Sequence, residues 1–159
     1  PLNDTTRYEL GGRIDYPFDF GWTVGGEYRY TDQDEDISPY TRNSFDIYTQ
    51  SARYWNTTVR LGLHRETVDN EKSPEDVDLF RYRVDITSLL PGGLVLAYNA
   101  DFGEDDGGTL PRKERRHSLR LDWSYRQVRF QLRASKADIS QGDNDRDDKR
   151  VTAEIRRVF

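Results

Sequence analysis

The sequence predicts an all-β protein: an antiparallel up-and-down transmembrane β-barrel. Three observations support this fold class. Apolar and polar residues alternate, the alternating segments are about as long as a barrel strand needs to cross a bilayer, and short and long connections follow one another in turn. Over the first thirty residues the apolar or glycine positions are Tyr8, Leu10, Gly12, Ile14, Tyr16, Phe18, Phe20, Trp22, Val24, Gly26, Tyr28 and Tyr30. This period of two indicates two β-strands with one apolar and one charged face.

The same test along the chain predicts nine strands. They span residues 7–16, 21–31, 43–54, 56–67, 78–87, 94–103, 117–126, 128–138 and 149–159. The fifth to eighth have the clearest apolar faces, at Phe80, Tyr82, Val84 and Ile86, then Leu94, Leu96, Tyr98, Ala100 and Phe102, then Leu119, Leu121, Trp123 and Tyr125, then Val128, Phe130, Leu132 and Ala134. The third is the weakest, because its apolar face fades after Phe45 and Ile47, so we expect a bulge or a change of side there. Its neighbour recovers the pattern from Thr57 to Leu63.

Connections between these strands alternate in length. The short ones are 17–20, 55–56, 88–93 and 126–127, and the long ones are 32–42, 68–77, 104–116 and 139–148. This order predicts an up-and-down meander in a single domain, residues 1–159, with short turns on one side and long loops on the other. The long loops are acidic, as in DQDED at 32–36 and DNDRDD at 143–148.

Composition excludes several classes of protein. Charged residues make up 33% of the chain, the mean hydropathy is −0.96, and no run of eighteen apolar residues exists, so the sequence has no transmembrane helix. A barrel strand presents only every second side chain to lipid and tolerates such values. The net charge of −5 gives no electrostatic reason to bind nucleic acid, and the absence of cysteine removes thiolate chemistry.

Aromatic residues gather toward the two ends of the predicted strands, while aliphatic residues and glycine occupy the middles. Two such belts are typical of the girdles of a membrane barrel, although aromatic residues also pack cores and pair across strands. The predicted girdle consists of Tyr8, Tyr16, Trp22, Tyr28, Tyr30, Trp55, Phe80, Phe102, Trp123, Tyr125 and Phe130.

The opposite face of the strands is charged. An arginine facing lipid at mid-bilayer costs about 2–4 kcal/mol, so in a membrane barrel these side chains must line the lumen. The predicted lumen-lining residues are Arg13, Asp15, Glu27, Arg29, Asp46, Arg60, His64, Glu66, Arg81, Arg83, Asp85, Asp101, Arg120, Asp122, Arg129, Arg133, Glu154 and Arg156. The solvated outer face of a soluble, lipocalin-like barrel would explain the same charges, and only the aromatic belts and the chain end favour the membrane.

The chain ends in VTAEIRRVF, with Val151, Ala153, Ile155 and Phe159 at alternate positions. This segment resembles the closing strand of Gram-negative outer-membrane β-barrel proteins, which typically ends in phenylalanine. It departs from that pattern at Arg157. The resemblance implies a bacterial outer-membrane location, recognition of Phe159 by the barrel-assembly machinery, periplasmic short turns and extracellular long acidic loops.

With that orientation, nine strands would place the start of the chain outside the cell. Bacterial single-chain barrels have even strand numbers. We therefore expect this chain to be the C-terminal part of a larger barrel, which upstream strands or a companion chain complete. If the third strand is not real, eight strands remain and the chain would be a complete small barrel.

Candidate catalytic residues are scarce, and we expect no enzyme, cofactor or metal. Of the two histidines, His64 is predicted to face the lumen near Glu66, and His117 to lie on the lipid side. An Asp/His or Ser/His site, as in barrel proteases or phospholipases, depends on geometry that sequence order does not reveal. The acidic loops offer alternating carboxylates for calcium but lack the glycine and closing glutamate of the calcium loop.

Three functions remain open at this stage. The first is the wall of a polar pore or conduit, water-filled or sheathing a partner protein, with weak ion selectivity because cations and anions are balanced. The second is a closed eight-stranded barrel acting as a membrane anchor or adhesion scaffold. The third is a soluble ligand-binding barrel.

Overall fold

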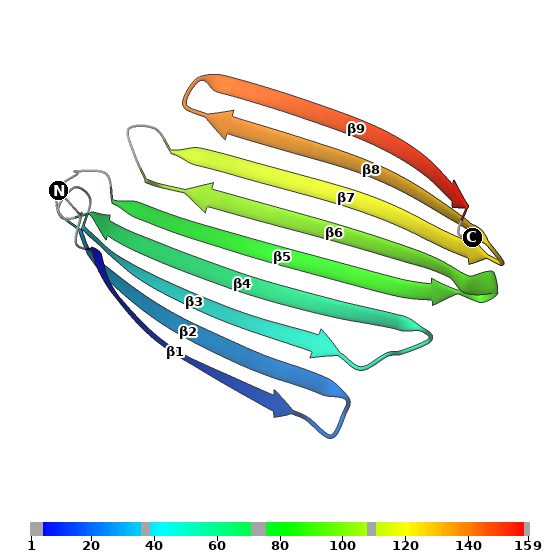
Figure 1. Cartoon of the computed structure of the whole chain (residues 1–159), viewed down its shortest axis with the longest axis horizontal. Coiled ribbons are helices and arrows are strands. Elements are labelled where there is room, and N and C mark those ends of the chain that lie inside the picture. Colours follow the sequence, from blue (N-terminus) through cyan, green and yellow to red (C-terminus); the bar gives the residue numbers. More distant parts are fainter. Residues whose placement is uncertain (1–4, 36–38, 71–75, 108–110, 158–159) are drawn as a thin grey trace.

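The computed structural model describes residues 5–35, 39–70, 76–107 and 111–157. They form one antiparallel sheet of nine strands in chain order (Figure 1). The strands are β1 (Thr5–Pro17), β2 (Trp22–Glu35), β3 (Tyr40–Ser51), β4 (Thr57–Asn70), β5 (Val77–Leu90), β6 (Leu94–Asp105), β7 (Arg112–Tyr125), β8 (Val128–Gln141) and β9 (Asn144–Arg157). A single 3₁₀ turn, η1 (Pro91–Gly93), lies between β5 and β6. The predicted all-β, up-and-down fold is confirmed.

All nine predicted strands are present, including the doubtful third. β3 pairs with β2 from Gln33↔Tyr40 to Trp22↔Ser51, and its pairing with β4 is equally regular. The bulge expected in β3 is therefore wrong. The alternation of side chains between the two faces is unbroken along β3. Thr49 and Ser51, which are small and polar, lie on the same face as Phe45 and Ile47 and continue it toward the turn.

The predicted strand ends are wrong where the long loops were expected. β2 continues to Glu35, so most of the acidic run at 32–36 belongs to a strand, and Asp36 lies outside the described residues. The loop predicted at 139–148 is a two-residue turn between β8 and β9, with Gly142 at φ 57°. Strands that extend beyond a bilayer need no apolar face, so the alternation that marks them in the sequence disappears before they end.

The opposite end of the sheet carries tight turns. Trp55 and Asn56 both have positive φ, 46° and 63°, between the paired residues Tyr54 and Thr57. Arg126, at φ 51°, lies in the two-residue turn between β7 and β8. We call this end, with the β1–β2, β3–β4, β5–β6 and β7–β8 connections, the turn end, and the other the loop end.

The sheet is not closed. Among the described residues, β1 pairs only with β2 and β9 only with β8, so each leaves one edge without a neighbouring strand. Both edge strands run from the loop end to the turn end, because they are the first and ninth strands of a meander (Figure 1).

Apolar side chains have no enclosed core. The buried apolar side chains of the described residues are the small ones of Pro39, Ala97 and Ala100, whereas Ile14, Val151 and Ile155 are 78%, 75% and 72% exposed. No helix among the described residues is long and apolar enough to cross a membrane. A surface of this kind requires an apolar medium or a partner to cover it.

Candidate functional site

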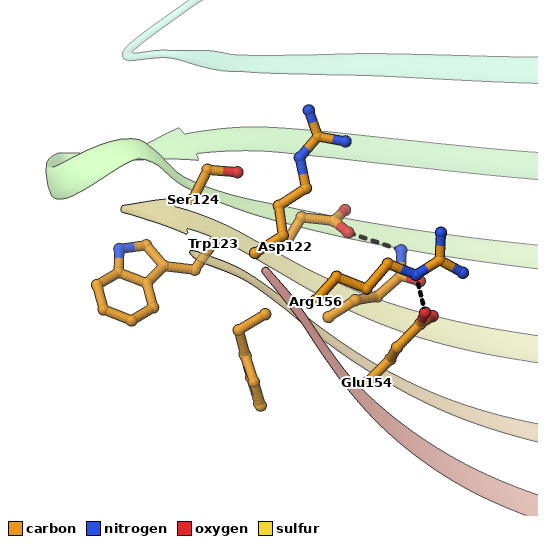
Figure 2. A pocket seen from close by; sticks show the side chains of 8 residues that line it. Asp122, Trp123, Ser124, Glu154 and Arg156 are labelled. Atoms are coloured by element: carbon orange, nitrogen blue, oxygen red, sulfur yellow. Dashed lines mark hydrogen bonds and ion pairs between the residues drawn. The ribbon is translucent and has the colours of Figure 1, made fainter. Parts of the chain in front are cut away.

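The two faces of the sheet differ in chemistry. Figure 2 shows Asp122 and Ser124 on one side of β7 and Trp123 on the other. Direct cross-strand partners share a face, so the register extends this assignment to every strand, as where Glu27 lies opposite Arg13. We call the charged side, which carries Asp122, the polar face, and the side that carries Trp123 the apolar face.

A cavity of about 530 Å³ opens on the polar face over β1–β6. It brings together many of the residues predicted to line a lumen, from six different strands. They are Arg13, Glu27, Arg29, Asp46, Arg60, His64, Arg81, Arg83, Asp85 and Asp101. Their charges are partly paired: Arg83 donates to Asp101 at 3.1 Å and Arg29 to Glu27 at 2.8 Å.

Tyr48 lies at the centre of one cluster in this cavity. Its hydroxyl donates to Asp15 and accepts from Arg13 Nη2 at 2.8 Å, and the Arg60 guanidinium lies 4.3 Å from the ring centroid. The ring fits because position 25 is glycine: a Cβ there would lie 2.4 Å from Tyr48 Cζ. Tyr48 was not predicted as a site residue, although it shares the strand parity of Asp46.

His64 is held on the polar face between two carboxylates. Its Nδ1 lies 2.8 Å from Asp46 Oδ1 and its Nε2 lies 3.8 Å from Glu66 Oε2. His117 lies on the apolar face, where it contacts the Tyr98 hydroxyl at 2.9 Å. The two histidines are on opposite faces, as the sequence predicts. Among the described residues no three His, Asp or Glu side chains are arranged to hold a metal ion.

A second group of predicted residues lies near the turn end of β7–β9. Asp122, Arg129, Glu154 and Arg156 contribute to a cavity of about 400 Å³. Gln131 donates to Asp122 at 2.7 Å, and Arg156 forms an ion pair with Glu154 (Figure 2). The other two predicted residues of these strands are also on the polar face, where Arg120 lies directly opposite Arg133.

Several charged residues of the polar face were missed. Arg112, Glu114 and Arg116 extend it on β7, and Arg150 extends it on β9. Arg116 Nε donates to Glu114 at 2.5 Å. The three residues of β7 were missed because the predicted strand began only at residue 117. Arg150 lies inside the predicted strand 149–159, on the parity of Glu154 and Arg156, so the period-two pattern already contained its signal.

The predicted girdle residues are mostly strand residues of the apolar face. Tyr8 and Tyr16 lie in β1, Trp22, Tyr28 and Tyr30 in β2, Phe80 in β5, Phe102 in β6, Trp123 and Tyr125 in β7, and Phe130 in β8. Trp123 stacks on Tyr125 with ring centroids 5.8 Å apart, and its Nε1 donates to Gly92 O at 3.1 Å. Trp55 is instead a turn residue and is 99% exposed. Phe159, the predicted assembly signal, lies outside the described residues.

Comparisons with known proteins identify the fold but no family. No protein-family model and no curated protein sequence matches the chain. Among solved structures it is similar to OmpT, an outer membrane protein of Vibrio cholerae. The in-vitro folded trimer form and a loop L8 deletion mutant each align at a TM-score of 0.72, with 10% identity over 94% of this chain and 54% of theirs. OmpT expressed in the outer membrane aligns at 0.70, with 9% identity over 94% and 56%. The chain thus spans just over half the length of these neighbours.

This likeness also corrects the expectation that the chain is not an enzyme. That exclusion rested on the scarcity of catalytic residues in the sequence. The OmpT neighbours, at 9–10% identity, show the fold alone, and this fold does not exclude an enzymatic role. The exclusion is therefore withdrawn.

The structural neighbours and the two-faced sheet agree. Nine antiparallel strands in chain order, an exposed apolar face and a charged opposite face are the features of a transmembrane barrel, and the neighbours with the same arrangement are outer-membrane proteins. The chain has the fold of a bacterial outer-membrane β-barrel protein.

Proposed function

We propose that this chain forms part of the wall of a polar conduit through the outer membrane. The observation that carries the proposal is the continuous polar face, on which ionisable side chains of neighbouring strands are brought into two cavities of about 400 and 530 Å³. In this proposal, the predicted lumen-lining residues are those whose side chains face the interior of the conduit.

The free energy of membrane insertion supports this placement. An arginine facing lipid at the bilayer midplane costs about 2–4 kcal/mol, and the polar face carries arginines in the middle of several strands. Facing a water-filled lumen, the same side chains keep most of their hydration. The apolar face, with Ile14 and Val151 exposed, then contacts lipid.

A complete eight-stranded anchor is less compatible with the structure. β3 is a full strand, paired along its length with both neighbours, so nine strands must be accommodated. Further strands, upstream in the same protein or from a companion chain, would complete the barrel beyond β1 and β9. The lumen of a barrel with more than nine strands is wide enough to admit water, solutes or an enclosed partner protein.

The orientation in the membrane follows from the resemblance of the last strand. If Phe159 is read by the barrel-assembly machinery from the periplasm, the turn end is periplasmic and the loop end is extracellular. The acidic run of β2 and its counterpart on β9 would then project beyond the outer leaflet.

Native extraction followed by conductance measurement tests the proposal. The protein, extracted in mild detergent, should migrate with any companion strands on an unheated gel and shift on boiling. Reconstituted into a planar bilayer, it should give steps of ion conductance. A heat-modifiable barrel that conducts no ions and encloses no partner would overturn the conduit and favour the anchor.

A further inference from the structure

One block of the polar face contains arginines without carboxylates. Two adjacent rows of direct cross-strand partners run across the middle of β7, β8 and β9, with Ser118, Ser135 and Arg150 in one and Arg120, Arg133 and Thr152 in the other. We call these six residues the arginine block. It offers three guanidinium groups and three hydroxyl groups, and the residues that continue the rows on β6, Ala97 and Asn99, are uncharged.

Two of the three guanidinium groups of the block, those of Arg133 and Arg150, have no ionic partner and no hydrogen bond among the described residues. Arg120 is different: it forms an ion pair with Asp122, with Nε 2.7 Å from Oδ2, and this Nε is buried and makes no hydrogen bond. Asp122 already accepts from Gln131 at 2.7 Å. The donors of Arg133 and Arg150 are therefore free to bind a ligand.

Arg120 and Arg133 are like charges directly opposite each other, and of the two only Arg120 has a carboxylate partner, Asp122. Like charges directly opposite each other destabilise a sheet, and the low-dielectric wall of a barrel strengthens the repulsion. By contrast, Arg83 and Asp101, which are direct partners on β5 and β6 in another row, form an ion pair without net charge. A strand added beyond β9 would reach Arg150 but not Arg120 or Arg133, whose neighbours on both sides are already in place.

We propose that the arginine block binds the phosphate group of a small anionic solute. This inference rests on the proposed conduit, because it requires the polar face to be reached from water. Guanidinium groups bind phosphate oxygens through paired N–H donors, and the hydroxyl groups of Ser135 and Thr152 supply further donors in the same two rows. The Ser118 hydroxyl already donates to Asn99 Oδ1 at 3.3 Å. A bound phosphate also removes the repulsion between Arg120 and Arg133.

Calorimetric titration with inorganic pyrophosphate tests the site directly. The native protein in detergent should bind it, and Arg133→Gln should weaken binding by roughly 10-fold or more, because charge-assisted hydrogen bonds are lost. Arg65→Gln is the control, since Arg65 lies on the apolar parity at the loop end, bound to Asp78. No binding by the native protein, or an equal loss in Arg65→Gln, would overturn the site.

Thermal unfolding supplies a second readout. Without phosphate, Arg133→Gln should unfold at a higher temperature than the native protein, because one of two opposed charges is gone. With pyrophosphate the order should reverse. If the variant is less stable under both conditions, the block is a structural element of the sheet and the proposal fails.

Conductance separates this inference from the proposed function. Pyrophosphate should reduce the chloride current of the native protein but not that of Arg133→Gln. A chloride current insensitive to pyrophosphate would refute the site and leave the conduit standing, whereas pyrophosphate binding without any conductance would refute the conduit alone. Binding that emerges only after an enclosed polypeptide is stripped away would assign the block to acidic side chains of that polypeptide.

Discussion

Gly25 and Gly26 are adjacent glycines on opposite faces of β2, and they should respond very differently to alanine. A Cβ at position 25 would lie 2.4 Å from Tyr48 Cζ and 2.3 Å from Asp15 Oδ1. At position 26 the nearest atom would be Asp46 O at 3.7 Å, an ordinary contact. Gly25→Ala must therefore displace both the Tyr48 ring and the Asp15 carboxylate, whereas Gly26→Ala displaces nothing.

The size of the effect follows from what Tyr48 loses. Turning the ring about 30° from its preferred rotamer costs about 0.5–1.5 kcal/mol, and separating it from the Arg60 guanidinium loses about 0.5–1 kcal/mol of cation–π attraction. Either substitution lowers the backbone entropy of the unfolded chain by the same amount, so this effect cancels in the comparison. Gly25→Ala should thus reduce the free energy of unfolding by about 1–2 kcal/mol relative to Gly26→Ala.

Urea unfolding of the protein in lipid vesicles, followed by tryptophan fluorescence, measures this difference. In a Tyr48→Ala background the difference between the two alanine variants should become smaller, and only the contact with Asp15 Oδ1 should remain. Equal stabilities of Gly25→Ala and Gly26→Ala, or an undiminished difference without the ring, would refute the packing of Tyr48 on β2.

Three further predictions test the two faces and one turn. Leu61→Arg, on the apolar face, should destabilise the inserted protein by about 2–4 kcal/mol. Gly62→Arg, on the polar face, where a Cβ meets only ordinary contacts, should be tolerated. Equal losses of stability in vesicle unfolding would contradict the assignment of the two faces. The chain has no cysteine, so Thr87→Cys should react with a membrane-impermeant maleimide and Ile86→Cys should not, and the opposite labelling would contradict the lumen assignment. Trp123→Phe removes the hydrogen bond to Gly92 O and should cost about 0.5–1.5 kcal/mol in the same unfolding assay, with Tyr125→Phe as a nearly neutral control.

The strands were predictable because their two environments enforce alternation. Even β3, where only Phe45 and Ile47 mark the apolar face, keeps its parity through both ladders. Strand ends at the loop end were not predictable by this rule. Both faces meet water there, and nothing in the run from Asn144 to Asp148 distinguishes a paired strand from a solvated loop except the Gly-Asp turn before it.

Side-chain partners were the least accessible part of the candidate site. The parity of Tyr48 places it with Asp46, but only the register shows that its ring lies over Gly25 and reaches Asp15 two strands away. The opposition of Arg120 to Arg133 likewise depends on the two-residue turn at 126–127, which sets the ladder of β7 with β8. Turn length, more than composition, decides which charges meet.

The common direction of β1 and β9 restricts what can close this sheet. A second copy inserted the same way up would bring its β1 beside β9 as a parallel neighbour, which an antiparallel meander does not allow. Strands that complete this sheet as a fully antiparallel barrel must be odd in number, and they must enter and leave on opposite sides of the membrane. A plasmid-encoded fragment with an even number of strands should therefore never rescue this chain in a split-protein complementation experiment, whereas an odd-numbered one of sufficient length should.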